Sequence, residues 1–176
     1  PGGPLALYVG NLKPEKGVMD LARAWEGVAR DLPDARLAVV GGGPLHGALE
    51  AALPTRATLV GPQPLDRVPL WMAACDVLVL PSHIEGMPNA VLEALASGRR
   101  VVATAVGGVP DLITSEVLGT LVPPHQPEAL TAALTQALRT GYDARAVAEQ
   151  GAHGGWEASA AALHAVLAAA AGASVQ

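Results

Sequence analysis

Several residue types are scarce or missing from this chain, and each absence excludes a class of protein. Among its 176 residues there is no Phe, and the single cysteine is Cys75. A lone cysteine excludes a disulfide framework and a cysteine-based metal site. The formal net charge is −5, and Lys and Arg do not cluster beyond Arg99-Arg100. The sequence therefore lacks the basic footprint of a nucleic-acid binder.

The chain also lacks a long apolar segment and an initiator methionine. No apolar run reaches the roughly 18 residues that a membrane-spanning helix needs, and no signal peptide is visible. We therefore expect a cytoplasmic protein, with peripheral contact to the inner face of the membrane at most. Because Pro1-Gly2-Gly3-Pro4 leads directly into a predicted strand, we also expect a piece of a longer protein.

What the sequence does contain is typical of one folded domain, here taken as residues 1–176. Hydrophobic residues make up 51% and charged residues 15%, which excludes a disordered chain. Short apolar runs predict strands over residues 5–9, 36–40, 57–60, 76–80, 100–104 and 120–122. Apolar spacing predicts helices over residues 17–31, 44–53, 66–74, 88–97, 109–114, 128–140, 143–150 and 155–171. The last of these belongs to a C-terminal helix taken as residues 155–176.

This alternation predicts an α/β fold: a doubly wound, parallel, six-stranded sheet with helices on both faces. In such folds the ligand binds beyond the carboxyl ends of the strands. The loops expected to line that edge of the sheet therefore begin at Gly10, Gly41, Gly61, Pro81, Thr104 and Pro123.

The strongest candidate site follows the fourth predicted strand and opens a helix. We expect Pro88 at the first helical position, because its ring fixes φ and it has no N–H to leave unpaired. The amides of Asn89, Ala90 and Val91 should then point out of the helix start without intrahelical partners. A helix start of this kind is a ready anion site.

Three charged side chains accompany this helix start in the predicted fold. Glu85 lies just outside it, and Glu93 lies in an apolar helix, where a buried carboxylate would need a partner such as a ligand hydroxyl. Lys16 stands at the start of the helix after the first strand, where the helix dipole disfavours a cation unless an anion lies between them. The alternative for each residue is an ordinary solvated side chain.

Two glycine turns also follow predicted strands. Gly41-Gly42-Gly43 allows close backbone approach by a ligand, but it is not a dinucleotide fingerprint, because His46 stands at the third glycine position. Gly107-Gly108 precedes a short helix. A plain strand-to-helix turn is the alternative for both. No nucleophile elbow is present, and no catalytic triad stands out in the sequence.

Taken together, these loops resemble the C-terminal domain of retaining GT-B glycosyltransferases, glycosyltransferase family 4. The stretch 9–17 resembles the family's first phosphate loop, and 39–45 resembles its glycine turn. Glu85 and Glu93, with seven residues between them, resemble its Glu-x7-Glu motif. The resemblance covers roughly residues 5–122, and it implies the Rossmann-like half of a GT-B fold.

The resemblance also implies a role for each candidate residue. Glu85 and Lys16 would be catalytic, Glu85 beside the hydroxyls of the donor sugar and Lys16 on the diphosphate. The residues implied to bind the donor are Gly10, Asn11, Gly86, Met87, Pro88, Asn89, Ala90 and Glu93, with Glu93 on the ribose hydroxyls. Gly61, Pro62 and Gln63 would border the base. Asn11 is a departure, since the family usually has Arg there, and one of two positive charges is lost.

The implied function is the donor-binding half of a hexosyltransferase. A sugar would pass from a UDP- or GDP-sugar, with retention, to a glycan or lipid-linked acceptor of the cell envelope that binds a separate N-terminal domain. This fragment alone should be inactive. No cofactor or metal is expected, because Asp-x-Asp is absent and the five His residues lack metal-ligand spacing. The alternatives are a sugar-nucleotide epimerase domain and a non-catalytic nucleotide-sugar binding module; a nicotinamide-binding domain is disfavoured.

Overall fold

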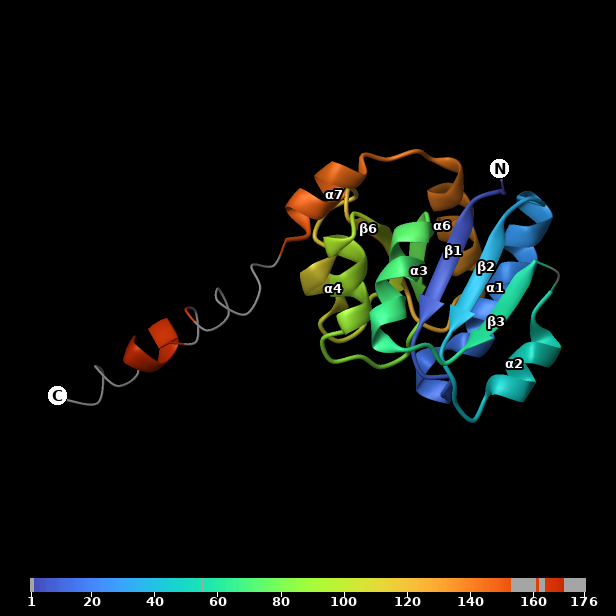
Figure 1. The fold of residues 1–176 in the computed structure, drawn as a ribbon, viewed down its shortest axis with the longest axis horizontal. Helices are drawn as coiled ribbons and strands as arrows, with labels where there is room; N and C mark the ends of the chain where they lie inside the picture. The colour runs from blue at the N-terminus through green and yellow to red at the C-terminus, as the bar shows by residue number, and fades with distance from the viewer. Residues whose placement is uncertain (1, 55, 153–160, 162–163, 170–176) are drawn as a thin grey trace.

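The sheet places six parallel strands in the order β3-β2-β1-β4-β5-β6 (Figure 1). The structure is a computed structural model that describes residues 2–54, 56–152, 161 and 164–169. The strands are β1 (Leu5–Val9), β2 (Arg36–Val40), β3 (Ala57–Gly61), β4 (Val77–Leu80), β5 (Arg100–Thr104) and β6 (Gly119–Val122). This is the order of the doubly wound nucleotide-binding fold, so the predicted fold class is confirmed.

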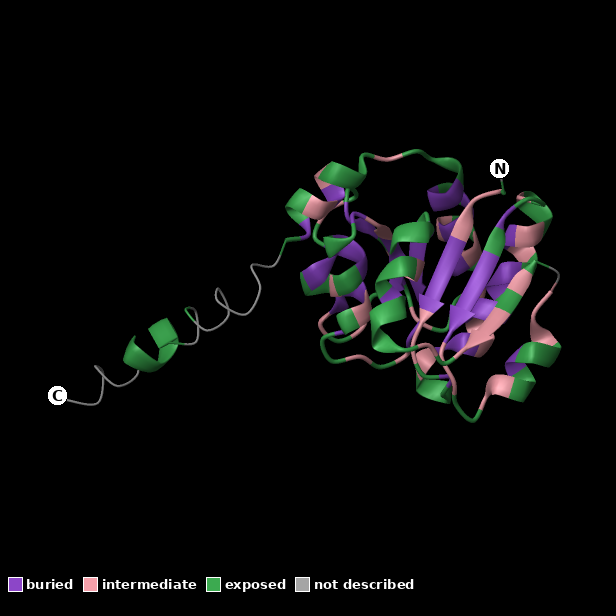
Figure 2. Cartoon of the chain, in the orientation of Figure 1, coloured by how far each residue is buried: buried purple, intermediate pink, exposed green. Residues whose placement is uncertain are grey.

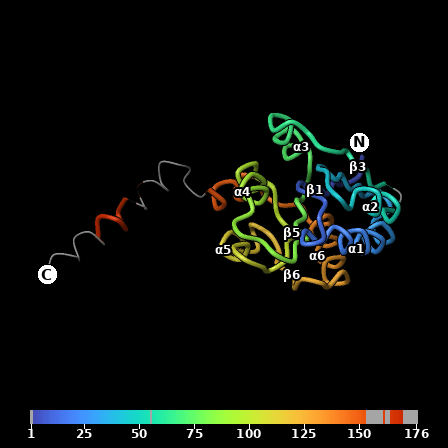
Figure 3. Tube along the Cα trace, turned by 90° about the horizontal axis from the view of Figure 1, so that it is seen from below, coloured from blue at the N-terminus to red at the C-terminus, as the bar shows by residue number. Residues whose placement is uncertain are grey.

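Helices cover both faces of the sheet, and Figure 3 shows α1 and α6 on one side with α3 and α4 on the other. The first face carries α1 (Val18–Asp31), α2 (His46–Ala52) and α6 (Pro127–Arg139). The second carries α3 (Val68–Ala74), α4 (Asn89–Ala96), α5 (Val109–Leu112) and α7 (Ala144–Gln150). Alternate strand residues supply the two layers: in β1, Tyr8 faces the first and Leu7 the second.

The central strands are buried over most of their length (Figure 2). All four residues of β4 are buried, which explains why this strand has the most hydrophobic sequence. In a chain without Phe, mainly Leu, Val and Ala fill the core, and Trp25 and Tyr8 are the largest fully buried side chains. A sheet covered on both faces needs such continuous apolar strands, because neither face meets water.

The predicted strands agree with the structure to within one residue at each end, but two helix starts were predicted wrongly. Pro44 lies in a turn before α2, and Pro88 is the N-cap of α4, with an extended backbone (φ −78°, ψ 111°). The ring of proline fixes φ but leaves ψ free, so proline can stand before a helix as well as inside its first turn. As a result the amide of Val91 donates to the carbonyl of Pro88 at 3.1 Å and is not free.

Other boundaries differ by short turns. The predicted helix 66–74 is a 3₁₀ turn, η2 (Leu65–Arg67), followed by α3, and a second 3₁₀ turn, η1 (Pro14–Lys16), precedes α1. The predicted helix 109–114 ends at Leu112. Most of the segment predicted as helical over 155–176 lies outside the described residues, and residues 161 and 164–169 are helical and exposed. Within the described part of the chain, no helix has the length and apolarity needed to cross a membrane.

Candidate functional site

A cavity of about 930 Å³ lies at the carboxyl ends of β1, β2 and β4, where the doubly wound fold predicts a ligand. Its volume is within the range of small-molecule and cofactor sites. Eleven of the thirteen predicted site residues line it: Gly10, Asn11, Lys16, Pro62, Gln63, Glu85, Met87, Pro88, Asn89, Ala90 and Glu93. The strand order thus brings together residues from loops that are far apart in the sequence.

The other two predicted residues, Gly61 and Gly86, do not line the cavity. The carbonyl of Gly61 accepts from the amide of Gly41 at 3.0 Å, and the carbonyl of Gly86 accepts from the amide of Gly108 at 2.8 Å. In this structure their backbones therefore tie neighbouring loops together behind the cavity wall.

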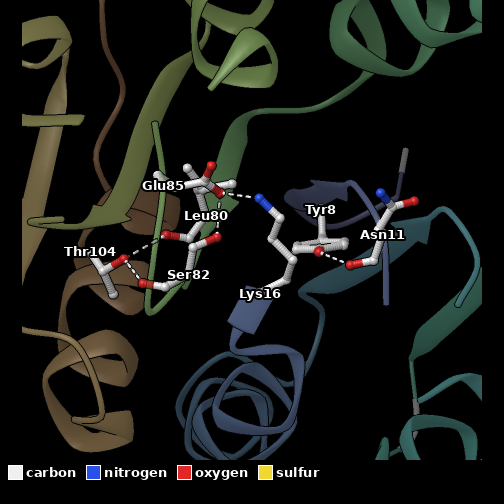
Figure 4. A network of polar contacts seen from close by, with 7 residues as sticks. All are labelled: Tyr8, Asn11, Lys16, Leu80, Ser82, Glu85 and Thr104. Carbon is white, nitrogen blue, oxygen red and sulfur yellow. Dashed lines mark hydrogen bonds and ion pairs between the residues drawn. The ribbon is translucent and has the colours of Figure 1, made fainter. Parts of the chain in front are cut away.

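An ion pair crosses the point where the strand order reverses, between the loops after β1 and β4 (Figure 4). The Nζ of Lys16 lies 2.7 Å from the Oε1 of Glu85, with side chains that are 26% and 7% exposed. The hydroxyl of Ser82 donates to the same oxygen at 2.7 Å. Sequence reasoning assigned Lys16 to a ligand and did not foresee this pair. In the structure described here, the positive charge of Lys16 is balanced within the protein.

The loop that carries Glu85 is held from β5 as well. The buried hydroxyl of Thr104 lies within hydrogen-bonding reach of the carbonyl oxygens of Ser82 and Leu80, the latter at 3.4 Å (Figure 4). Gly107 has a left-handed backbone (φ 54°), and a Cβ there would collide with the carbonyl of Glu85. The Gly107-Gly108 turn therefore supports the Glu85 loop, a structural role that the sequence left open.

Tyr8 fixes the loop after β1. Its hydroxyl donates to the carbonyl of Asn11 at 2.9 Å (Figure 4). Burial, reinforced by the negative charges of Glu85 and Glu15, raises the pKa of Tyr8 far above its usual value. The phenol consequently stays protonated and remains a hydrogen-bond donor across the physiological pH range.

The glycine turn after β2 has a packing role. Gly41 has φ 140°, and a Cβ there would meet the carbonyl oxygen of Gly10. The amide of Leu12 donates to the carbonyl of Gly42 at 2.9 Å. These glycines let the backbones of the loops after β1 and β2 come into contact. The sequence predicted close approach by a ligand here, and the structure shows close approach by a neighbouring loop.

The start of α4 forms another wall. Among the described residues, the amides of Asn89 and Ala90 donate no hydrogen bond, as predicted for this helix start. Glu93 is exposed and lines the cavity, whereas Val91 and Leu95 on the same helix are buried. The carboxylate of Glu93 is therefore solvated, and no burial forces it to seek a partner.

The cavity is poor in positive charge. Of the described residues that line it, Lys16 is the one cation, and two carboxylates, Glu85 and Glu93, line it as well. Asn11, which stands where the resembled family has Arg, adds no charge. Sequence reasoning did not assign Tyr8, Val9, Val40, Leu65, Val68, Pro69 and Leu80 to the lining. Val9, Val40 and Leu80 are the last residues of β1, β2 and β4, so their position at strand ends could have identified them as lining residues. Val68 and Pro69 lie in α3.

The family described as "Glycosyl transferases group 1" matches residues 3–140. This chain belongs to that family. The group 1 domain is 39% identical over 145 residues to the 2-deoxystreptamine N-acetyl-D-glucosaminyltransferase of Streptomyces fradiae, covering 78% of this chain and 34% of the relative. It is 39% identical over 133 residues to the putative teichuronic acid biosynthesis glycosyltransferase TuaC of Bacillus subtilis, covering 75% of this chain and 32% of TuaC. The group 1 domain thus spans about a third of the length of these curated relatives.

Solved structures agree with this assignment. Sucrose-phosphate synthase from Thermosynechococcus elongatus superposes with a TM-score of 0.75 at 30% identity, covering 96% of the group 1 domain and 46% of that chain. The C-terminal domain of the glycosyl transferase group 1 protein LpcC from Francisella tularensis superposes with a TM-score of 0.70 at 25% identity, covering 89% of this chain and 84% of that chain. The fold is therefore the Rossmann-like half of the GT-B type. Its homologues are transferases, which favours that class over the epimerase and nicotinamide alternatives.

Proposed function

We propose that this domain binds the nucleoside-diphosphate sugar of a retaining family 4 glycosyltransferase, with UDP or GDP as the nucleotide. The observation that carries the proposal is the cavity, which joins the start of α4, a single lysine and two carboxylates at one edge of the sheet. An N-terminal domain would supply the acceptor site, so the domain alone should transfer no sugar.

The diphosphate would lie between Lys16 and the start of α4. The helix dipole and the amides of Asn89 and Ala90 favour an anion at that place. Gly10 and Asn11 would approach the phosphates from the β1 side, with Tyr8 fixing their loop through its bond to the Asn11 carbonyl. Lys16 and these amides would stabilise the charge that develops on the leaving diphosphate, without a metal ion.

The two glutamates would distinguish the two sugars of the donor. Glu85, beside the helix start, would accept hydrogen bonds from the transferred hexose, together with backbone groups of Gly86, Met87 and Pro88. Glu93, one turn into α4 and exposed to the cavity, would accept from the ribose hydroxyls. Pro62 and Gln63 would border the base, with Gly61 fixing their loop through its bond to Gly41.

The acceptor is proposed from the relatives. TuaC is named as a putative teichuronic acid biosynthesis glycosyltransferase. WaaG is described as a glycosyltransferase involved in lipopolysaccharide biosynthesis. It superposes with a TM-score of 0.72 at 29% identity, covering 86% of this chain and 42% of WaaG. Both names point to a glycan or lipid-linked acceptor of the cell envelope. We therefore place the full-length enzyme in the cytoplasm, at the inner face of the membrane when it meets a lipid-linked acceptor.

A thermal-shift panel with the purified domain tests this proposal. UDP, GDP, uridine and guanosine are compared in EDTA, so that no divalent metal contributes. Because binding to the folded state raises the melting temperature, one diphosphate should raise it clearly while its nucleoside raises it much less. Equal shifts for nucleoside and diphosphate would refute the phosphate site.

A further inference from the structure

A second cluster of polar side chains lies on the same edge of the sheet but outside the cavity lining. Asp20 comes from α1, His83 from the connection between β4 and α4, and His125 from the connection between β6 and α6. The potential ligand atoms of the three all lie within 4.8 Å of one another. The sequence spacing of the histidines hid this cluster, because the three residues meet only through the strand order.

The distances within the cluster suit a tetrahedral metal ion. The Nε2 of His83 lies 2.8 Å from the Oδ2 of Asp20, and the Nδ1 of His125 lies 3.9 Å from the same oxygen. Around an ion with bonds of about 2.0–2.1 Å, tetrahedral ligand atoms are about 3.3 Å apart. The two observed distances lie on either side of that value, so to seat an ion the hydrogen bond between His83 and Asp20 would lengthen and His125 would move toward Asp20.

The surroundings of Asp20 prepare it to be a ligand. Arg23 approaches its other oxygen, Oδ1, at 3.5 Å, which leaves Oδ2 turned toward both histidines. Partners of this kind orient ligating carboxylates in metal sites. The His83 and His125 rings are stacked, with centroids 3.8 Å apart and planes inclined by 37°, and the exposed His125 ring would turn to bring its nitrogen onto the ion.

We propose that Asp20, His83 and His125 form a binding site for a divalent transition metal ion, best matched by Zn²⁺. Two imidazoles and one carboxylate are ligands that Zn²⁺ accepts in four-coordinate sites, whereas Mg²⁺ and Ca²⁺ prefer all-oxygen sets. The side chain of His125 is 67% exposed, so the fourth position faces solvent and takes a water molecule.

The ion would act as a brace for the donor site. The amide of His83 already donates to the carbonyl of Glu15 at 2.8 Å, next to Lys16, and His83 stands two residues before Glu85. A metal ion shared by Asp20, His83 and His125 would fasten the Glu85 loop to α1 and to the connection before α6. It would not touch the reacting atoms, so it is a structural site distinct from the metal-free donor site proposed above.

The test uses untagged, EDTA-stripped protein titrated with Co²⁺, followed by competition with Zn²⁺. We expect one equivalent of Co²⁺ to produce the intense visible absorption of a tetrahedral complex, Zn²⁺ to remove it, and Zn²⁺ to raise the melting temperature. His125→Asn is the cleanest variant, because the residue is exposed and Asn tolerates its left-handed backbone (φ 59°). It should weaken Co²⁺ binding at least about tenfold, the scale on which even outer-shell partners act.

Asp20→Asn should cause the same loss, and His46→Asn, in α2 outside the cluster, is the matched control that should keep wild-type affinity. Circular dichroism confirms that each variant is folded. The proposal is overturned if Co²⁺ stays in its pale hydrated form, or if folded His125→Asn and Asp20→Asn bind it as tightly as the wild type. It is equally overturned if the loss appears only in His46→Asn.

Discussion

The ion pair between Lys16 and Glu85 defines how the site can meet a ligand. A lysine ammonium has three donors, so Lys16 can bind a phosphate oxygen while it keeps its contact of 2.7 Å with Glu85. Glu85 nevertheless opposes a second anion near Lys16, because like charges repel at short range. The same carboxylate that would hold the sugar therefore weakens the hold on a bare diphosphate.

This opposition gives Glu85→Gln a split effect. Binding of the bare diphosphate should be unchanged or tighter, since a negative charge beside Lys16 is removed. Binding of the nucleotide sugar should weaken by about 1.5–3 kcal/mol, the scale of a hydrogen bond to a charged group. Calorimetric titrations of both ligands measure the split, and a parallel loss for the two ligands would argue against contact between Glu85 and the sugar.

Glu93 should act on the ribose and nowhere else. Because its side chain is exposed, Glu93→Gln should leave the fold intact. It should weaken binding of the ribonucleoside diphosphate by about 1.5–3 kcal/mol, but weaken the 2′,3′-dideoxy diphosphate much less, because that ligand lacks the hydroxyls. Four affinities, from two proteins and two ligands, give the coupling. A coupling of zero would mean that Glu93 does not reach the ribose.

We expect Cys75 to lower the stability of the domain in alkaline solution. Burial chiefly, with Asp76, raises its pKa to about 11 against the lowering effect of Arg99. Between about pH 9 and 11 the unfolded thiol loses its proton while the folded thiol keeps it, so the unfolded state gains stability as pH rises. Wild type should lose about 2–3 kcal/mol more than Cys75→Ala over this range, at 1.36 kcal/mol per pKa unit. Denaturant unfolding at pH 8 and 11 measures it; equal losses would contradict it.

At the scale of elements, the connections at the carboxyl edge support one another through backbone contacts. The Gly107-Gly108 turn after β5 holds the Glu85-Gly86 backbone, and the Gly41 turn after β2 packs on the loop after β1. The position of Glu85 in this site therefore depends on glycines that belong to a different connection.

Gly107→Ala should damage the site, and Gly47→Ala should not. A Cβ at Gly107 collides with the Glu85 carbonyl and the backbone there is left-handed, so we expect a loss of about 1–3 kcal/mol in stability together with weaker nucleotide-sugar binding. Gly47 lies exposed in α2 with open space around its Cα, and alanine there should stabilise the helix by about 0.5–1 kcal/mol. Denaturant unfolding compares the two. A Gly107→Ala domain as stable as Gly47→Ala would refute the supporting role of this turn.

The elements also show how far a sequence can be interpreted. Strands such as β5 were predicted with correct ends, because a strand buried on both faces is a continuous apolar run bounded by polar or glycine residues. The helix start at Pro88 was predicted wrongly, because proline suits both the N-cap and the first turn and only ψ distinguishes them. The start at Pro44 was also wrong, because Pro44 lies in the turn before the N-cap of α2, Leu45. Local composition therefore predicts that an element exists more reliably than it predicts the residue at which the element begins.

At the scale of the whole molecule, the strand order assembles the site. Once the order is known, the carboxyl ends of β1, β2 and β4 become neighbours, and most of the cavity lining follows from the sequence. Two features could not be predicted from the sequence: the ion pair of Lys16 with Glu85, which are 69 residues apart, and the cluster around Asp20. Both depend on the directions of side chains from separate loops, which no spacing rule encodes.

If this edge of the molecule binds the diphosphate of a donor through Lys16, the two lysines of the chain provide a direct test. Lys16→Gln removes the charge but leaves a donor for Glu85, which is only 7% exposed. Lys13→Gln makes the same charge change at an exposed position of the same connection, outside the cavity lining.

The measurement is calorimetric titration of wild type and both variants with the preferred nucleoside diphosphate and with its nucleoside, in EDTA. Lys16→Gln should weaken diphosphate binding by about 1.5–3 kcal/mol and leave nucleoside binding unchanged. Lys13→Gln should bind both ligands as the wild type does. Equal diphosphate affinity in Lys16→Gln and Lys13→Gln would contradict the account.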